Sequence, residues 1–518
     1  MPQAEPESAL TVLDWLIVAA YFVVVIYLGS RFRARQVSSE HYFLGGRRLP
    51  GWAVGMSIFA TIISSLSFLA LPGKSFKDDL QYLAAVAVVP VTALVATRFI
   101  IPLFRQRIRL SAYEYLEKRF GLAARFYGNT IFLVTNYFKM SLVLYLLCLA
   151  ISGMTGWNLY GLILLVGVAT MTYTFFGGIE GVVWTDVIQG FLLLAGGVIS
   201  VFFILFWSPV EPQRVLAMAS EGGKFRLVSF GLSPSRISVY VLVCFGLSLY
   251  MTRYATDQTV VQRYLLSPST AKARRSLWVS AAFVMVVWVV FMFIGVLLWV
   301  YYELKPDLLP PHVRAKPDQV FAYFIGHELP TGVTGMILAG LFAASMSTLS
   351  ADINSIASVI VDDFYNKLAP GGDDRRRLVF SRLCVVAIGS LSILVAFILS
   401  HYKSMVEVFF AVSSVIAGGM VAMFFLGFFT RRCSRQGLYV GLCVGVVFIA
   451  WAALTNPGGP LQQTPWWLPR FPMHIYWLGL ISNVVVFAVG YLASRLLTPG
   501  YQAAAELTVY EKPGAQPA

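Results

Sequence analysis

Charged residues are scarce in this chain: they make up 12% of its 518 residues, whereas a soluble protein usually carries about 25%. So few charges, spread over nearly the whole length, exclude an ordinary water-soluble enzyme, a disordered scaffold and a secreted disulfide protein. The five cysteines show no CxxC spacing, and most of them stand in apolar runs. We therefore expect buried free thiols rather than a metal site made of cysteines.

Catalytic and nucleotide-binding motifs are also missing. The sequence contains no GxxxxGK followed by Ser or Thr, no HExxH and no GxSxG. The five histidines fall in or beside expected loops, so they do not form a ligand set for zinc or iron. The sequence therefore does not predict an enzyme.

What the chain does contain is a series of apolar runs of about 20 residues, the length that crosses a bilayer as a helix. Hydrophobic residues make up 58% of the sequence, and the mean hydropathy is +0.73. The runs predict an all-α integral membrane protein with about thirteen transmembrane helices. Their expected ranges are 11–30, 50–72, 80–104, 126–152, 158–176, 182–208, 237–253, 276–301, 332–360, 379–400, 405–429, 436–455 and 473–494.

The distribution of basic residues orients these spans. With the N-terminus outside, the cytoplasmic loops carry 24 Lys and Arg and the external segments carry 11, as the positive-inside rule expects. The net charge of +14 is then a feature of membrane topology, with anionic lipids as the partner and no role for nucleic acid. We expect a multi-pass protein of the inner or plasma membrane, with a cytoplasmic C-terminus, that functions as a monomer.

Two spans carry polar residues at membrane depth, where such residues are costly unless they are paired or face water. In span nine, Ser347, Ser350 and Asn354 share one helical face. Hydroxyls of this kind, with carbonyls from an unwound neighbouring helix, suit a hard monovalent cation. Small polar residues also simply join helices, and this second explanation applies equally to the five hydroxyl residues of span two: Ser57, Thr61, Ser64, Ser65 and Ser67.

Six short segments form a recognisable set between residues 42 and 432. They are Tyr42–Arg48, Ser111–Gly121, Tyr173–Gln189, Thr256–Arg263, the serine-rich part of span nine and Phe425–Arg432. In this order they resemble the sodium:solute symporter family, which includes sodium/glucose, proline, pantothenate and sialic-acid cotransporters. Thirteen spans with an external N-terminus also resemble that family.

The resemblance implies a core of ten helices, spans two to eleven, arranged as two inverted five-helix repeats of the leucine-transporter type. Spans two and seven would be broken helices. It implies sodium-coupled symport, and it divides the chain into an extracellular N-terminus with a flanking helix (1–36), the ten-helix core (37–432), two C-terminal helices (433–496) and a cytoplasmic tail (497–518).

The family's main sodium site combines carbonyls of the first core helix with carbonyl and hydroxyl oxygens of the eighth. Alignment of the motifs assigns these ligands to Ala60, Ile63, Ala344, Ser347 and Thr348. Some members hold a second sodium, for which Asp186, Ser347 and Ser350 match, although Ala351 stands where a further hydroxyl is expected. Asp186 is equally well explained as the structural partner of a basic loop residue.

The resemblance says less about the solute. The implied substrate-binding positions are Ser64, Ser67, Lys139, Tyr250, Arg253 and Phe410. The polar residues of sugar-transporting members are largely absent, whereas Lys139 stands where sialic-acid transporters hold a carboxylate with a basic residue. Asp352 is an alternative partner for Lys139, and Arg253 is also explained as an interfacial arginine.

Two classes of solute therefore remain open. An organic anion such as a carboxylate or a sialic-acid-like sugar acid is one, and a neutral sugar or polyol is the other. A transporter-like membrane sensor without transport is the alternative from a different functional class. The stoichiometry between sodium and solute does not follow from the sequence.

Overall fold

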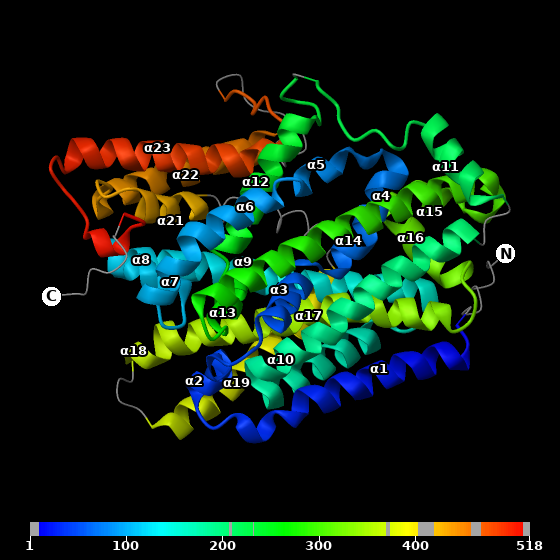
Figure 1. Cartoon of the computed structure of the whole chain (residues 1–518), viewed down its shortest axis with the longest axis horizontal. Coiled ribbons are helices and arrows are strands. Elements are labelled where there is room, and N and C mark those ends of the chain that lie inside the picture. Colours follow the sequence, from blue (N-terminus) through cyan, green and yellow to red (C-terminus); the bar gives the residue numbers. More distant parts are fainter. Residues whose placement is uncertain are drawn as a thin grey trace.

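The computed structural model describes residues 10–206, 210–231, 233–368, 373–401, 419–456 and 468–510. Over these residues the chain is helical and contains no strand. Long helices run along the long axis of the molecule, as Figure 1 shows. Short helices gather at its two ends, with α2, α7, α8, α13 and α18 at one end and α11, α15 and α16 at the other (Figure 1).

Eight long helices follow the expected spans. They are α1 (Val12–Arg31), α9 (Leu122–Thr155), α10 (Leu159–Phe206), α14 (Thr270–Leu304), α17 (Val333–Val359), α19 (Asp374–His401), α22 (Arg435–Thr455) and α23 (Leu478–Leu497). Two further spans are pairs of helices, α3 (Gly51–Ile62) with α4 (Ser65–Lys77) and α12 (Val239–Ala255) with α13 (Gln258–Leu265). The third expected span is a composite that contains η3 (Leu80–Tyr82), α5 (Leu83–Val86), α6 (Val89–Val95), η4 (Ala96–Ile100) and α7 (Ile101–Arg107).

The remaining helices are short and mostly lie between the spans. They are η1 (Arg33–Arg35), α2 (Ser39–Leu44), η2 (Gly45–Arg47), α8 (Ala112–Phe120), α11 (Pro212–Glu221), η5 (Pro306–Leu308), α15 (Pro311–Arg314), α16 (Pro317–His327), η6 (Ile360–Tyr365), α18 (Asn366–Leu368), α21 (Met420–Phe429), η7 (Ile475–Trp477) and η8 (Ala505–Leu507).

The helices agree with the expected spans. In the described part of the chain nine helices are long and apolar enough to cross a membrane, or up to eleven if each of two bent pairs counts as one span. The helix α10 covers two expected spans, and α21 lies in the eleventh, whose residues 402–418 are outside the described residues. Each of the thirteen expected ranges therefore contains helix.

Spans five and six form the single kinked helix α10, although we expected a break of several residues between them. The kink is at Gly178, whose φ of 54° and ψ of −157° are not helical. A side chain does not fit there, because a Cβ on Gly178 would lie 2.9 Å from the carbonyl oxygen of Tyr42. The glycine pair at 177–178 is thus a close contact between helices and not a loop turn.

Both predicted broken spans are bent. The axes of residues 51–62 and 67–77 differ by 59°, and the chain between α3 and α4 is extended at Ile63 (φ −93°, ψ 122°). The axes of α12 and α13 differ by 49°. Asp257 caps α13, since its Oδ1 accepts hydrogen bonds from the backbone N–H and the hydroxyl of Thr259 at 3.0 and 2.6 Å. Span seven therefore continues to Leu265, and the expected loop around Arg263 is wrong because this segment is helical.

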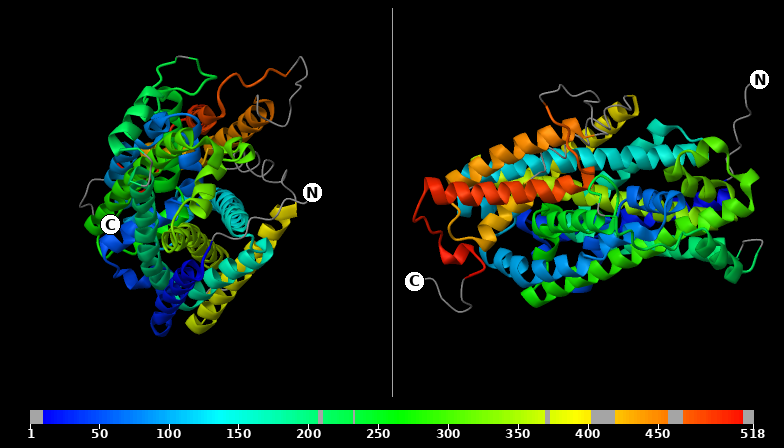
Figure 2. Two further views of the ribbon diagram at one scale, coloured as in Figure 1. Left: turned by 90° about the vertical axis from the view of Figure 1, so that its right-hand side faces the viewer. Right: turned by 90° about the horizontal axis from the view of Figure 1, so that it is seen from above.

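Helix α17 lies at the centre of the bundle. In its apolar window 89% of the residues are buried, and none of the other eight unbroken spans among the described residues exceeds 61%. It packs against α1, α3, α9, α10 and α19, and the end-on view of Figure 2 shows the helices gathered around the core. Its many Gly, Ala and Ser residues let neighbours approach closely. The predicted cation face is therefore on a helix that is buried along nearly its whole length.

Candidate functional site

Hydroxyl groups of α17 contact the broken end of α3. Ser347 Oγ donates to the carbonyl oxygen of Ala60 at 2.9 Å and to that of Ala344 at 3.2 Å. Thr348 Oγ1 donates to the Ala344 carbonyl at 3.3 Å. Ile63 stands where the chain leaves α3. The structure thus brings four of the five predicted sodium ligands into contact and places the fifth at the adjoining break.

These five residues fit a sodium ion chemically. They offer only uncharged carbonyl and hydroxyl oxygens, and each residue is at most 2% exposed. Oxygen ligands suit hard cations, whereas soft metals prefer thiolates or imidazoles. Because the oxygens come from both α3 and α17, a cation held among them would join the two helices.

Asp186 lies in a buried ion pair with an arginine from the broken span seven. Its Oδ2 accepts hydrogen bonds from Ser57 Oγ at 2.6 Å and from Arg263 Nη2 at 3.1 Å. Arg263 also donates through Nε to Ser57 Oγ at 2.8 Å and through Nη1 to the carbonyl of Thr259 at 2.8 Å. Both charged side chains are fully enclosed. This network ties α3, α10 and α13 together.

The second sodium site remains a prediction. The Ser350 hydroxyl donates to the backbone carbonyl of Ser347 at 3.1 Å. Asp186 Oδ1 has no hydrogen-bond partner among the described residues. Arg263 is therefore the structural partner of Asp186, which the sequence did not identify. The other carboxylate oxygen of Asp186, Oδ1, is not bonded to that partner.

Four charged residues form a cluster where α9, α12, α13 and α17 meet. Lys139 Nζ donates to Asp352 Oδ1 at 3.0 Å and to Asn136 Oδ1 at 2.7 Å. Arg253 Nη1 donates to Asp257 Oδ2 at 2.6 Å. Asp352 interacts electrostatically with Asp257 and Arg253 as well as with Lys139. The cluster is neutral overall, because two cations face two carboxylates.

Exposure separates the cations of this cluster from the acids. The side chains of Lys139 and Arg253 are 21% and 25% exposed, whereas those of Asp352 and Asp257 are 0% and 6% exposed. The two acids therefore pair with Lys139 and Arg253 on the buried side of the cluster. The two cations keep further N–H donors that can bind another group. Arg253 is therefore in an ion pair across the bend between α12 and α13 and is not only an interfacial arginine.

Three of the other predicted solute-binding residues lie on α12 or at the start of α4. Ser64 precedes the first residue of α4, Ser67 is in its first turn, and both are partly buried. Tyr250 on α12 is buried, and its ring centroid lies 6.0 Å from that of Tyr254. Phe410 lies outside the described residues.

The sequence also matches a known protein family and individual relatives. The profile of the sodium:solute symporter family matches residues 42–445. The chain belongs to this family. The symporter is 30% identical over 493 residues to the sodium/sialic acid symporter NanT of Aliivibrio fischeri, and the match covers 93% of each chain. Sodium is accordingly its coupling ion.

Solved structures confirm the fold. The symporter superimposes on a Na+-coupled sialic acid symporter in a substrate-bound outward-open state with a TM-score of 0.86, at 29% identity, over 95% of this chain and 100% of that one. It also matches Mhp1, a nucleobase-cation-symport-1 family transporter, with a TM-score of 0.55 at 15% identity, over 89% and 96% of the two chains. The second match shows the fold alone. The inverted-repeat core of the leucine-transporter type is thus confirmed.

Sequence reasoning missed two charged residues of the symporter's interior, Arg263 and Asp257. The expected spans 237–253 and 276–301 leave both residues in the loop between them, because basic residues follow Arg263 and indicate a loop. A signal was present: Asp257 and Thr259 form a helix cap, and the apolar residues Val260, Val261 and Leu265 continue a helix beyond it.

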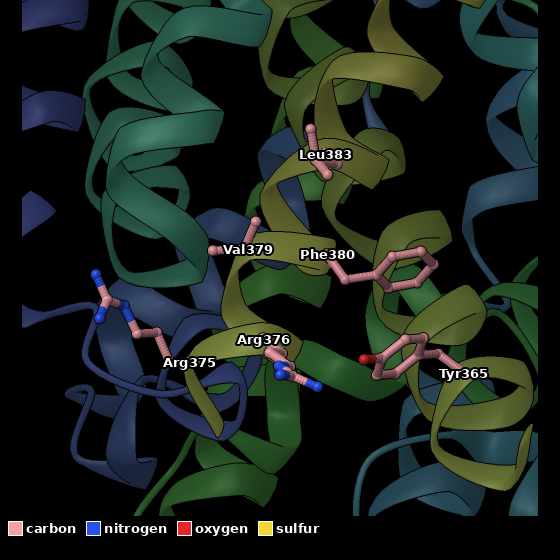
Figure 3. Close-up of a pocket in the computed structure, with 6 residues that line it drawn as sticks. All are labelled: Tyr365, Arg375, Arg376, Val379, Phe380 and Leu383. Carbon is pink, nitrogen blue, oxygen red and sulfur yellow. The ribbon is translucent and has the colours of Figure 1, made fainter. Parts of the chain in front are cut away.

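A pocket at one end of the symporter bundle contains none of the predicted site residues. Figure 3 shows its lining from η6 and α19. The lining residues are Tyr365, Arg375, Arg376, Val379, Phe380 and Leu383. It is therefore not the site where sodium or the solute was expected.

Proposed function

We propose that the symporter carries a sialic-acid-like sugar acid across the membrane together with sodium. The observation that carries this proposal is Lys139, a partly exposed lysine at membrane depth. Its ammonium has three hydrogens, and Asn136 and Asp352 take two of them. An ammonium with a remaining donor is suited to a carboxylate. The names of the relatives add support, because NanT and the solved homologue are both described as sialic acid symporters.

The alternatives explain less of the structure. A neutral sugar or polyol does not need an ammonium in the membrane, where charge is costly. A sensor without transport does not need cation ligands that join two helices. We also propose that the protein catalyses no covalent reaction, because the buried acids Asp186, Asp257 and Asp352 of the described interior stand in ion pairs with Arg263, Arg253 and Lys139 and not beside a nucleophile.

In this proposal the main sodium site consists of Ala60, Ile63, Ala344, Ser347 and Thr348. Asp186 and Ser350 are the candidates for a second ion. The solute contacts Lys139 and residues around it: Ser64, Ser67, Tyr250, Arg253 and Phe410. The N-terminus lies outside and the C-terminus in the cytoplasm, as the basic loops favour. Residues 37–432 form the transport core between the flanking helix and the two C-terminal helices, and one chain is the working unit.

Uptake by purified protein in liposomes tests the function. An inward sodium gradient is expected to drive accumulation of radiolabelled N-acetylneuraminate, a sialic acid, above its external concentration. Replacing sodium with potassium should abolish the accumulation, because the solute then has no coupled driving force. Lactate and glucose serve as comparison solutes. Uptake of glucose but of neither acid, or uptake that does not depend on sodium, would contradict the proposal.

The variant Lys139→Gln is expected to weaken binding of N-acetylneuraminate by about 2–5 kcal/mol, because the carboxylate loses a charged partner in an enclosed site. The same change leaves Asp352 buried without its cation and should lower the melting temperature. Asp352→Asn in addition should restore the melting temperature but not the binding. Isothermal titration and thermal melts in detergent measure the two effects separately.

The matched control is Arg98→Gln, which removes a cation from the exposed face of a span. It should change neither binding nor melting temperature appreciably. A Lys139→Gln protein that melts lower but binds the sugar acid as tightly as wild type would show that Lys139 serves only as the partner of Asp352.

A further inference from the structure

The pocket at the start of α19 has a charged mouth and an apolar wall. Arg375 and Arg376 occupy the first turn of the helix, and Val379 and Leu383 follow at intervals of four residues along it. Residues spaced in this way lie on one helical face. Val379 and Leu383 are 51% and 59% exposed. An exposed apolar strip thus leads from two arginines into the membrane-spanning part of the helix.

A pair of aromatic rings forms the second wall. Tyr365, the last residue of the π-helical segment η6, stacks on Phe380 of α19, with ring centroids 4.3 Å apart and planes 20° from parallel. Figure 3 shows the Tyr365 hydroxyl on the same side as the Arg376 side chain, while Arg375 points to the other side of the helix. The stacked rings fix the width of the pocket between η6 and α19.

The nearby acids are engaged elsewhere. Asp373 Oδ1 accepts a hydrogen bond from the backbone N–H of Arg375 at 3.3 Å, and Asp374 Oδ1 lies 3.8 Å from Arg377 Nη1. Within the described residues, no carboxylate forms an ion pair with the Arg375 or Arg376 side chain. The mouth of the pocket therefore carries two guanidinium groups whose charge is available to an anion.

The position of the pocket along α19 corresponds to the boundary of a bilayer. Helix α19 has 28 residues, which corresponds to about 42 Å at 1.5 Å per residue. The hydrocarbon core is about 30 Å thick, so the first turns of α19 extend into the headgroup region. Its first turn carries the arginines, and the second and third carry the apolar residues, which is the order of a phospholipid's headgroup and chains.

We propose that this pocket binds one anionic phospholipid. The phosphate contacts Arg376, Arg375 adds positive charge from the other side of the helix, the Tyr365 hydroxyl donates to a headgroup or glycerol oxygen, and an acyl chain lies along Val379, Phe380 and Leu383. Basic pockets at membrane boundaries recognise anionic headgroups in this way. The apolar wall favours a lipid over a free phosphate, because an acyl chain packs against that wall and a free phosphate does not.

Lipid titration of the purified full-length protein in detergent tests the proposal. Phosphatidylglycerol is expected to raise the melting temperature and to remain bound to the protein in native mass spectrometry, whereas phosphatidylcholine does neither. The double variant Arg375→Gln/Arg376→Gln should weaken phosphatidylglycerol binding about thirtyfold, which corresponds to about 1 kcal/mol for each arginine. Leu383→Asn should weaken it as well, because a polar group then interrupts the apolar wall.

The control is Arg431→Gln/Arg432→Gln, since this second pair of adjacent exposed arginines lies outside the pocket. It should bind phosphatidylglycerol like wild type. Retention of the lipid by the Arg375/Arg376 variant overturns the proposal. Equal stabilisation by glycerol 3-phosphate, which has the phosphate without chains, also overturns it, because the site would then be one for soluble anions.

Discussion

Replacing Arg263 with glutamine is expected to destabilise the symporter by about 3–5 kcal/mol, because the change leaves the carboxylate of Asp186 buried without its cation. Both side chains are fully enclosed, and Ser57 alone would remain as a hydrogen-bond donor to the carboxylate. Thermal melting in detergent, monitored by tryptophan fluorescence, should show a large drop in melting temperature. Expression of folded protein should fall in parallel.

Removing the acid as well should reverse much of this loss. In Arg263→Gln/Asp186→Asn the two neutral amides can hydrogen-bond to each other, so no buried charge remains unpaired. The control is Arg314→Gln, which breaks an exposed ion pair with Glu303; an exposed pair contributes about 1 kcal/mol or less. A double variant no more stable than Arg263→Gln alone would show that the arginine acts through other contacts.

The single variant Asp186→Asn distinguishes a structural role of this acid from a role in binding sodium. If Asp186 helps to hold a second sodium, the folded variant should show a lower Hill coefficient for sodium in uptake assays. If the acid serves only Arg263, the Hill coefficient should stay at its wild-type value while the melting temperature falls.

The fold followed from the sequence because bilayer physics allows few solutions. A helix is the only way for an isolated apolar run to satisfy its backbone hydrogen bonds in lipid, so composition alone located the thirteen ranges. The resemblance of the six segments then predicted the inverted-repeat core. The two breaks were also predictable, because spans two and seven correspond to the broken helices of the family.

The predicted sodium ligands of α17 lie close together in the sequence, whereas the partners in the buried ion pairs lie far apart. Ala344, Ser347 and Thr348 stand within five residues of one another on α17, so one motif places them together. The partner of Asp186 lies 77 residues away in the chain, and no local pattern names it. Arg263 was misplaced for a related reason: charge at the end of a span indicates a loop, but here a buried carboxylate on another helix neutralises it.

The neutral cluster around Lys139 could likewise be predicted only in part, because its charges come from different helices. Asp352 was recognised as a partner because an acid within an apolar helix is unusual. Asp257 was not, because it stands just outside the expected span 237–253, where an acid is ordinary and indicates no buried partner. The structure therefore adds to the sequence mainly the pairing of charges across helices.

Ser347→Ala and Thr348→Ala are each expected to raise the sodium concentration for half-maximal uptake by about tenfold to a hundredfold. Each change removes one uncharged oxygen ligand, and a contact between a neutral polar group and an ion contributes about 1.5–3 kcal/mol. Alanine favours a helix more than serine or threonine does, so α17 should not lose stability. Sodium-dependent uptake of N-acetylneuraminate in liposomes measures the shift.

The matched control for these variants is Ser358→Ala, which removes a buried hydroxyl on the same helix that donates only to the carbonyl of Ser355, at 2.8 Å. Its half-saturation concentration for sodium should equal that of wild type, because Ser358 is about ten residues from the oxygen cluster of α3 and α17. The decisive comparison is between Ser347 and Thr348. Ser347 contacts both helices, whereas the described bond of Thr348 stays within α17, so Ser347→Ala should also weaken the link between them. If both variants keep the sodium dependence of wild type, sodium is bound elsewhere and the hydroxyls only join the helices.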